Sequence, residues 1–339
     1  MRSSELDYDL PQELVAQHPV EPRDASRLLV HDRATGAIRH RSFGDLPDEL
    51  DGELVVVNDT RVVPARLDLR RASGGEVEVL LLEPLEGDEW EALARPSRRL
   101  RAGELLAVRG EARLRQAYNA CVDSTQALSR AGTATVELLE ALGDGRWRVR
   151  LGGEPAGAVP LPPYIETPLD DPERYQTVFS KSTGSAAAPT AGLHFTPELL
   201  ARVDHERVTL HVGLDTFRPL TVETVEEHEL HGERYSVEQS ACARIAAAER
   251  VLAVGTTTTR VLETLARGAP REGRSHLFIT PGYEFRRVDA LLTNFHLPRT
   301  TLLALVMAFA GIETTRDLYA LAIAEGYRFY SFGDAMLIL

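Results

Sequence analysis

The stretch VLAVGTTTTRVLETLAR, residues 251–267, contains a strand, a turn and a helix in succession. Its first four residues are apolar and predict a buried strand, Gly255 predicts a turn, and the residues that follow predict a helix. This order is typical of α/β proteins, in which such units build a sheet covered by helices. The four consecutive threonines at the turn raise a further question, which is what their hydroxyls face.

The same alternation recurs on both sides of this stretch. Further strand-like runs are ELVVVN (53–58), RVTLHVGL (207–214), HLFIT (276–280) and DALLTN (289–294). Helices are predicted at TPELLARV (196–203), TTRVLETLAR (258–267) and TTLLALVMAFAG (300–311). A good helix start is expected at Thr196, which precedes a proline.

The middle of the chain has a different pattern. GEVEVLLLEPL (75–85), WEALARP (90–96), ELLAV (104–108) and RWRVRL (146–151) are short β-patterned runs separated by glycine-rich turns. Such spacing is typical of a small antiparallel sheet or barrel. The sequence therefore predicts an α/β domain built from residues 1–62 and 152–339, with an antiparallel β-barrel domain inserted at 63–151. Residues 115–132 interrupt the barrel pattern and are expected to form an excursion loop or short helix.

Composition excludes several classes of protein. The chain has 339 residues with 43% hydrophobic content, enough for a sizeable core. Its longest apolar run is too short to span a bilayer, and its first residues lack a signal peptide's apolar core, so we expect a cytoplasmic protein. Two cysteines, Cys121 and Cys242, are too few for a disulfide framework and are expected to be reduced.

The net charge of −13 predicts that any polyanionic partner docks on a local basic patch. RPSRRLR supplies one candidate, with Arg95, Arg98, Arg99 and Arg101 on an expected loop between two strands. Composition alone leaves two interpretations open: a solvated arginine-rich loop, or a loop that contacts phosphates.

Ligands of open α/β sheets bind beyond the carboxyl ends of the strands, and the segments expected there are polar. They are NDTR (58–61), DTFRP (215–219), GTTTTR (255–260), PGYEF (281–285) and TNFHLPRT (293–300). A Gly-Thr turn that opens a helix can bind an anion, although the threonines could equally cap the helix. No P-loop or dinucleotide fingerprint accompanies it.

Two histidines stand out from the ten in the chain. His194 and His296 each follow an irregular polar stretch and precede a predicted helix, so they are candidate acid or base groups. A structural role is the alternative for both. In the strand RVTLHVGLDTF, His211 and Asp215 share one face, which indicates an edge strand or a cavity wall.

The chain also contains long motifs that together resemble those of a known family. They include DYDLPQELVAQHPVEPRDASRLLV, VVNDTRVVPARL, WEALARPSRRLRAGE, GSAAAPTAGLHFT, HVGLDTFRP, GTTTTR, DALLTNFHLPRTTLLALVMAFAG and AEGYRFYSFGDAML. In this order, over nearly the whole length, the chain resembles the S-adenosylmethionine:tRNA ribosyltransferase-isomerases of queuosine biosynthesis. One departure is the insertion at 115–132, which is longer than the family usually carries in its barrel.

The resemblance implies an α/β domain with an inserted barrel, and a reaction. S-adenosylmethionine, as co-substrate, donates its ribosyl part to 7-aminomethyl-7-deazaguanine at the tRNA wobble position. Epoxyqueuosine forms, adenine and methionine leave, and no metal is required. The partner is tRNA carrying the deazaguanine precursor, no membrane is involved, and we expect a monomer.

The reaction needs a base for the proton beside the sulfonium, an acid for the departing adenine, and groups that hold the carboxylate and the ribose. The expected catalytic residues are His194 and His296 for proton transfer and Asp59 and Asp215 for the ribose or amine. The expected S-adenosylmethionine-binding residues are Arg61, Thr190, Gly255, Thr256, Thr257 and Arg260, with Thr258 and Thr259 capping the helix. The arginines at 95, 98, 99 and 101 are expected to bind tRNA.

Two alternatives stay open at this point. A phosphoribosyl-type transferase would bind a sugar diphosphate with a metal through NDTR and GTTTTR. A non-catalytic RNA-binding protein would use only the barrel. Release of free adenine from S-adenosylmethionine in the presence of tRNA distinguishes the three.

Overall fold

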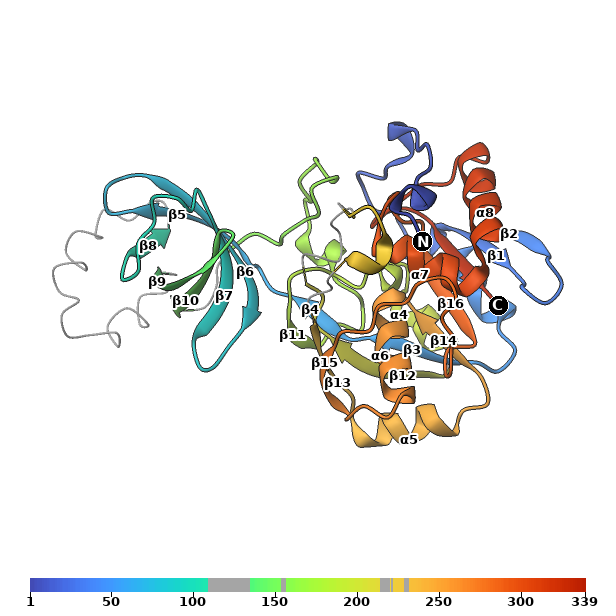
Figure 1. The fold of residues 1–339 in the computed structure, drawn as a ribbon. Helices are drawn as coiled ribbons and strands as arrows, with labels where there is room; N and C mark the ends of the chain where they lie inside the picture. Colours follow the sequence, from blue (N-terminus) through green and yellow to red (C-terminus); the bar gives the residue numbers. More distant parts are fainter. Residues whose placement is uncertain (109–134, 154–156, 214–219, 221, 229–231) are drawn as a thin grey trace. The chain divides into compact units, whose positions relative to one another are not determined.

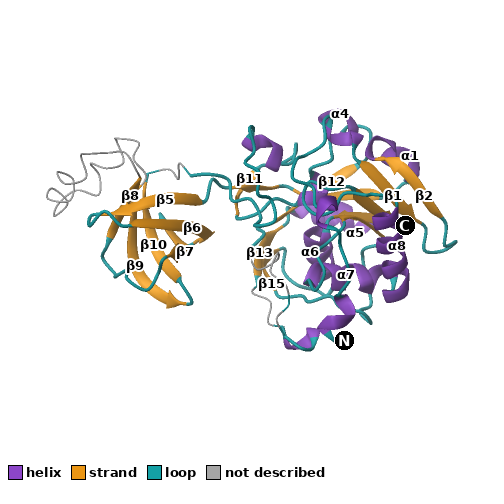
Figure 2. Ribbon diagram, turned by 90° about the horizontal axis from the view of Figure 1, so that it is seen from above, coloured by secondary structure: helices purple, strands orange, loops and turns teal. Residues whose placement is uncertain are grey.

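The computed structural model describes residues 1–108, 135–153, 157–213, 220, 222–228 and 232–339. The residues expected to form the excursion, 115–132, lie outside these ranges, as do Cys121 and Asp215. The described chain forms two compact units. The first contains Met1–Arg61, Pro162–Ser182 and Ala188–Leu339, and the second contains Val62–Leu161 and Thr183–Ala187. Figures 1 and 2 show the helices and strands of each unit.

The first unit is built on a mixed sheet with nine strands among the described residues, in the order β15-β13-β12-β3-β14-β16-β17-β1-β2. These strands are β1 (Arg27–His31), β2 (Ile38–Ser42), β3 (Leu54–Asn58), β12 (His205–Leu210), β13 (Glu233–Ser236), β14 (Val251–Val254), β15 (Glu272–Ser275), β16 (Ala290–Asn294) and β17 (Ala335–Ile338). Strands β12, β3, β14 and β16 run parallel, while β17 is antiparallel to β16.

Helices cover both faces of this sheet, with α1 and α4 on one face and α6, α7 and α8 on the other (Figure 2). The α-helices are α1 (Leu46–Glu49), α4 (Pro197–Leu200), α5 (Gln239–Ala247), α6 (Thr256–Ala266), α7 (Thr301–Ala310) and α8 (Ile312–Ala324). Short 3-10 helices are η1 (Ser3–Leu6), η2 (Gln12–Leu14), η3 (Arg23–Ala25), η4 (Phe43–Asp45), η5 (Pro172–Tyr175), η6 (Thr190–Gly192) and η8 (Val225–Glu227).

The central strands are apolar because both of their faces are covered. Val55 and Val57 point into a core that includes Phe43 and Phe195 on the α1 and α4 side. Val56 is equally buried, and α6 packs against β3 and β14. The predicted cap at Thr196 is confirmed, since its side chain accepts a hydrogen bond from Leu199 N at 3.1 Å.

The second unit is a closed antiparallel barrel in the order β10-β7-β6-β5-β8-β9. Its strands are β5 (Arg66–Arg71), β6 (Glu76–Pro84), β7 (Glu89–Arg95), β8 (Leu105–Val108), β9 (Thr135–Gly143) and β10 (Arg146–Gly152). Val77, Val79 and Leu81 alternate with polar or less buried residues, so the barrel interior is filled by every second side chain. A separate two-stranded sheet pairs β4 (Thr60–Val62) with β11 (Ser182–Ser185).

The predicted fold class, an α/β domain with an inserted antiparallel barrel, is therefore confirmed. Two details are wrong. The run 276–280 is not a strand, because the carbonyl of Leu277 accepts a hydrogen bond from the Arg260 side chain at 3.0 Å and the strand β15 ends before it, at Ser275. The strand at 207 ends at Leu210, and it is an interior strand between β13 and β3 rather than an edge.

No helix in the described ranges combines the length and the apolar character needed to cross a membrane.

Candidate functional site

A pocket in the α/β unit lies where β14 leads into α6 and where β16 ends. It brings together five of the residues expected from the sequence, namely Thr190, Gly255, Thr256, Thr257 and His296. The rest of its lining is Ala188, Pro189, Ala191, Val212, Thr293, Asn294 and Leu302. We call this the strand-end pocket.

The turn after β14 gives this pocket the amino-terminal end of a helix. Gly255 has φ 88°, in the left-handed region that favours glycine, and α6 begins at Thr256. The first intrahelical hydrogen bond of α6 is from Thr259 N to Gly255 O, at 3.1 Å. The N–H groups of the preceding three residues lie in the first turn, where the helix dipole favours a negative group.

The four threonines of this turn divide into two pairs. Thr256 and Thr257 line the strand-end pocket, and each is 6% exposed. The hydroxyls of Thr258 and Thr259 instead donate to the carbonyls of Val254 and Gly255, at 2.7 and 3.1 Å. The expectation that the later pair caps the helix is therefore wrong: both lie inside α6, whose N-cap is Gly255.

His296 lines the strand-end pocket on the β16 side. Its Nε2 lies 2.8 Å from the Thr293 hydroxyl, while Nδ1 has no hydrogen-bond partner within the described part of the chain. Its peptide N–H donates to the Tyr319 hydroxyl at 3.0 Å, and its carbonyl accepts a hydrogen bond from Tyr8. Burial lowers the pKa of His296 from 6.5 to about 3, so the ring is neutral at physiological pH.

His194 does not line this pocket but lies behind Asn294. The Asn294 side chain bridges the two, with Oδ1 3.0 Å from Thr190 Oγ1 and Nδ2 3.1 Å from His194 Nε2. The other ring nitrogen, His194 Nδ1, lies 2.8 Å from Ser26 Oγ. A row of polar groups thus connects the pocket to the buried interior.

A second pocket shares Thr190, Asn294, His296 and Leu302 with the first. Its other lining residues are Tyr164, Phe295, Leu297, Thr300, Tyr330 and Ser331. The rings of Tyr164 and Tyr330 lie 4.8 Å apart, and the Tyr164 hydroxyl is 2.7 Å from Ser331 Oγ. The two adjoining pockets therefore offer a polar helix end and an aromatic wall.

Besides His194, three described residues expected at the site lie outside both pockets. The Asp59 carboxylate accepts a hydrogen bond from Thr209 Oγ1 at 2.6 Å. Arg61 donates to Ser180 Oγ at 3.0 Å and forms an ion pair with Glu173. Both side chains are therefore held by other protein groups. Asp59 directly follows the last residue of β3, and Arg61 lies two residues further on.

Arg260 is the third of these residues. It forms a buried ion pair with Glu233 and donates to the carbonyls of Leu277 and Ser275, at 3.0 and 3.1 Å. Its guanidinium therefore joins α6 to β13 and to the end of β15. Asp215, also expected at the site, lies outside the described residues.

A separate surface feature belongs to the barrel unit. Arg95, Arg98, Arg99 and Arg101 are exposed and follow one another from the end of β7 toward β8, as expected from the sequence. None of the four side chains forms an ion pair with another described residue. We call them the unpaired arginines.

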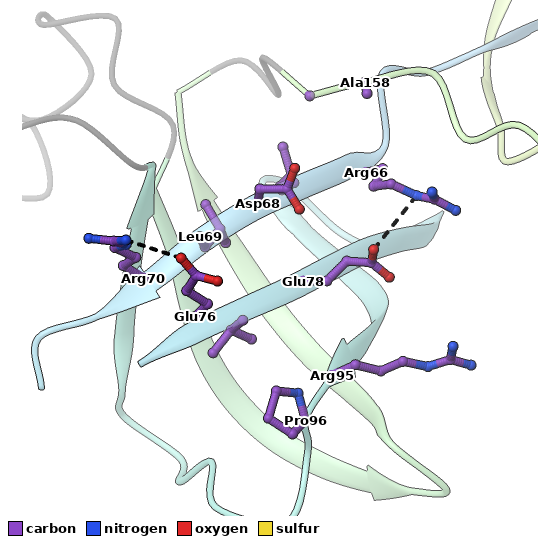
Figure 3. Close-up of a pocket in the computed structure, with 12 residues that line it drawn as sticks. Arg66, Asp68, Leu69, Arg70, Glu76, Glu78, Arg95, Pro96 and Ala158 are labelled. Atoms are coloured by element: carbon purple, nitrogen blue, oxygen red, sulfur yellow. Dashed lines mark hydrogen bonds and ion pairs between the residues drawn. The ribbon is translucent and has the colours of Figure 1, made fainter. Parts of the chain in front are cut away.

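Other arginines of the barrel have carboxylate partners. Arg146 lies 3.1 Å from Glu91, and Arg150 lies 2.9 Å from Glu89. Figure 3 shows two more such pairs, Arg66 with Glu78 and Arg70 with Glu76, while Arg95 points away from both. These residues line a pocket together with Asp68, Pro96 and Ala158. Among the described arginines of the barrel unit, the four at positions 95, 98, 99 and 101 are therefore the ones without an ion-pair partner in the described chain.

No group of three or more histidine, cysteine, aspartate or glutamate side chains with metal-binding geometry occurs in the described parts of the chain.

Sequence reasoning missed the two strand-end asparagines. Asn58 ends β3 and holds the Leu210 peptide through both its amide atoms, each at 3.0 Å, and its Nδ2 lies 3.4 Å from Thr257 Oγ1. Asn294 ends β16 and holds Thr190 and His194. In both cases the sequence contains a recognisable pattern: an asparagine stands at the end of a largely apolar strand.

Comparisons with known proteins place these features in context. Residues 3–338 match the family described as queuosine biosynthesis protein. The chain is 52% identical to the S-adenosylmethionine:tRNA ribosyltransferase-isomerase of Rubrobacter xylanophilus, over all of this chain and 98% of that one. It is 50% identical to the protein of the same name from Moorella thermoacetica, over the full length of both. A crystal structure of S-adenosylmethionine tRNA ribosyltransferase from Thermotoga maritima aligns with a TM-score of 0.54 and 38% identity, covering 99% of this chain and 100% of that one.

Proposed function

The chain belongs to the queuosine biosynthesis protein family, and on that premise we propose how its residues divide the work of the reaction. Its activity is that of an S-adenosylmethionine:tRNA ribosyltransferase-isomerase. The ribosyl part of S-adenosylmethionine moves to 7-aminomethyl-7-deazaguanine in tRNA, and epoxyqueuosine forms with release of adenine and methionine. The full-length similarity carries this conclusion.

We place S-adenosylmethionine at the strand-end pocket. Its carboxylate lies at the first turn of α6, where Thr256 and Thr257 offer N–H groups and hydroxyls to an anion. This helix end takes the role that the sequence suggested for Arg61 and Arg260, whose guanidinium groups have protein partners. The adjoining pocket, with Tyr164 and Tyr330, offers ring faces against which a nucleobase can stack.

Of the two candidate histidines, His296 is the one that lines the strand-end pocket, where we place S-adenosylmethionine. Its ring is neutral, and Nδ1 can accept a proton from the carbon beside the sulfonium and then pass that proton to departing adenine. Because burial disfavours the imidazolium, a proton taken up there is readily passed on. Asp215 remains the proposed partner of the ribose or of the acceptor amine, and Asp59 supports the end of β3 through Thr209.

We propose that tRNA docks on the unpaired arginines at positions 95, 98, 99 and 101. Exposed guanidinium groups without a carboxylate partner exchange only water and counterions for phosphates when tRNA binds. In this proposal residues 63–151 form the RNA-docking barrel domain, and residues 1–62 with 152–339 form the catalytic domain. We further propose a cytoplasmic monomer that needs no metal.

The test combines the purified protein, S-adenosylmethionine and tRNA carrying the deazaguanine precursor. We expect adenine and methionine in equal amounts, with one adenine for each modified nucleoside, and no effect of a chelator. Methylated tRNA accompanied by S-adenosylhomocysteine would overturn the proposal, and a magnesium requirement would favour a phosphoribosyl-type transferase.

A further inference from the structure

Two peptide carbonyls fix the direction of the hydrogen bonds that run from Thr190 to Ser26. The Asp334 carbonyl lies 3.5 Å from Asn294 Nδ2, and the Arg23 carbonyl lies 3.4 Å from Ser26 Oγ. A carbonyl can only accept, so the Asn294 amide nitrogen faces both Asp334 and His194. The reverse orientation would set Asn294 Oδ1 against the Asp334 carbonyl. The Ser26 hydroxyl likewise directs its hydrogen to Arg23.

The direction of these hydrogen bonds determines which ring nitrogen of His194 carries the hydrogen. Its Nε2 accepts from the Asn294 amide, and its Nδ1–H donates to Ser26. The ring is stacked on Phe43, with centroids 4.9 Å apart. Burial, followed by the positive charges of Arg328 and Arg23, lowers the pKa of His194 from 6.5 to about 3. The lone pair of Nε2 is therefore committed to Asn294, and His194 has no free nitrogen with which to take a proton from a substrate.

The same direction also determines what Thr190 can recognise. Its hydroxyl has one hydrogen, which points to Asn294 Oδ1 at 3.0 Å. Thr190 lines both pockets, so the oxygen lone pairs are what it can present to a ligand there. In S-adenosylmethionine the complementary groups are donors: the two ribose hydroxyls, the ammonium and the amino group of adenine.

We propose that His194 is a positioning residue: as a neutral acceptor it orients the Asn294 carboxamide. The Thr190 hydroxyl donates its hydrogen to that carboxamide. Thr190 Oγ1 can therefore only accept a hydrogen bond from S-adenosylmethionine, and it recognises one donor of that ligand. The proposal rests on the proposed function, because it takes the ligand from that reaction. It gives His194 a role that involves no proton transfer.

Two substitutions at His194 separate this role from the alternatives. In His194→Gln the side-chain amide reaches the place of Nε2 and can accept from Asn294. In His194→Asn the amide reaches only the place of Nδ1, next to Ser26. Neither amide can act as a base at any pH of the assay. His205→Gln, at the amino-terminal end of β12, is the matched control, since His205 lines neither pocket and its Nδ1 lies 3.2 Å from the Val203 carbonyl.

The measurements are the KM for S-adenosylmethionine, kcat, and the dissociation constant by calorimetry. We expect His194→Gln to stay within about threefold of the wild type, and His194→Asn to raise KM and the dissociation constant by about tenfold or more while kcat changes less. Equal and large losses of kcat in both variants would overturn the proposal in favour of a general base. If His194→Asn, and not His194→Gln, kept the affinity of the wild type, the proposal would be overturned. The important contact of His194 would then be its hydrogen bond to Ser26.

A second pair of variants carries the test if His194→Asn does not fold. Thr190→Ser keeps the acceptor and should bind like the wild type, whereas Thr190→Val should bind about tenfold more weakly. The loss caused by Thr190→Val should vanish for one analogue of S-adenosylmethionine that lacks the recognised donor. The analogues are the 2′-deoxy form, the 3′-deoxy form, the form without the α-ammonium and the form without the adenine amino group. Unchanged affinity in Thr190→Val would overturn the proposal. Failure of the proposed function is distinguishable, because the wild type itself would then release no adenine.

Discussion

The guanidinium of Arg260 binds the carboxylate of Glu233 inside the α/β unit, with both side chains less than 10% exposed. Both partners are further held, Arg260 by the Leu277 and Ser275 carbonyls and Glu233 by the Gly213 N–H at 3.0 Å. The pair therefore connects α6 to β13 and to the end of the edge strand β15.

We predict that Arg260→Met destabilises the protein by about 3–5 kcal/mol, because it removes the buried guanidinium that pairs with the Glu233 carboxylate. Urea denaturation measures the change. The double variant Arg260→Met/Glu233→Gln should recover part of the loss, since the carboxylate charge is then removed as well. If the single variant folds at low temperature, it should still bind S-adenosylmethionine; a folded variant that has lost binding would place Arg260 in contact with the ligand.

The threonine turn gives a second prediction. Replacing Thr256 and Thr257 together with valine should weaken S-adenosylmethionine binding by roughly 1–3 kcal/mol, the usual range for polar groups left unpaired. Calorimetric titration measures the affinity. Thr258→Val is the matched control on the same helix, because its hydroxyl is bonded to the Val254 carbonyl and should not affect the ligand. Equal affinity in the double variant and the wild type would reduce the turn to a structural role.

The unpaired arginines give a third prediction. Arg98→Ala/Arg99→Ala should weaken tRNA binding and reduce the slope of log affinity against log salt by roughly one for each lost phosphate contact. The control is Arg148→Ala/Arg150→Ala on the same barrel, where the arginines lie 3.5 Å from Glu140 and 2.9 Å from Glu89. Binding isotherms at several salt concentrations test both. A slope that falls only in the control pair would move the docking surface to β10.

Stability should also depend on pH through the two buried histidines. The pKa of each is lowered to about 3 in the folded protein, so between pH 6.5 and about 3 the unfolded chain binds protons that the folded protein does not. Stability is therefore complete above pH 6.5 and falls as the pH is lowered, by an amount of the order of 2 kcal/mol per histidine down to about pH 5.

Urea denaturation at about pH 7 and about pH 5 tests this dependence. His296→Gln should show a smaller loss of stability between the two pH values than the wild type. An identical pH dependence in His296→Gln would mean that His296 titrates normally.

Some elements were predictable because they satisfy a single local pattern. Strands β3, β14 and β16 are formed mainly by apolar residues, and α4 begins at a proline that follows the N-cap Thr196. The residues of each element are therefore enough to predict it. Strand β2 was not predicted, because four of its five residues are exposed and it exists by pairing with β1. The run 276–280 has strand-like residues, yet the Arg260 side chain binds one of its carbonyls.

The candidate site was predictable to a similar extent. The rule that ligands bind beyond strand ends identified Gly255, Thr256, Thr257 and His296, and the family resemblance added Thr190. The structure gathers all five at one pocket. The rule could not separate His194 from His296, since both follow polar loops. Their difference arises from Asn294, whose amide lies between His194 and the pocket, and a contact across 100 positions of sequence leaves no local pattern.

Strand β17 has a consequence for how this protein is made. It contains Ala335–Ile338 and lies between β16 and β1, so Leu28 finds its partner at Ala335 only after more than 300 further residues have been synthesised. The barrel strands β5 to β10 are contiguous in the chain and can close on themselves earlier. The mixed sheet, with its high contact order, is the slower of the two to assemble. Until then β1 and β16 present unpaired edges to chaperones and to neighbouring nascent chains.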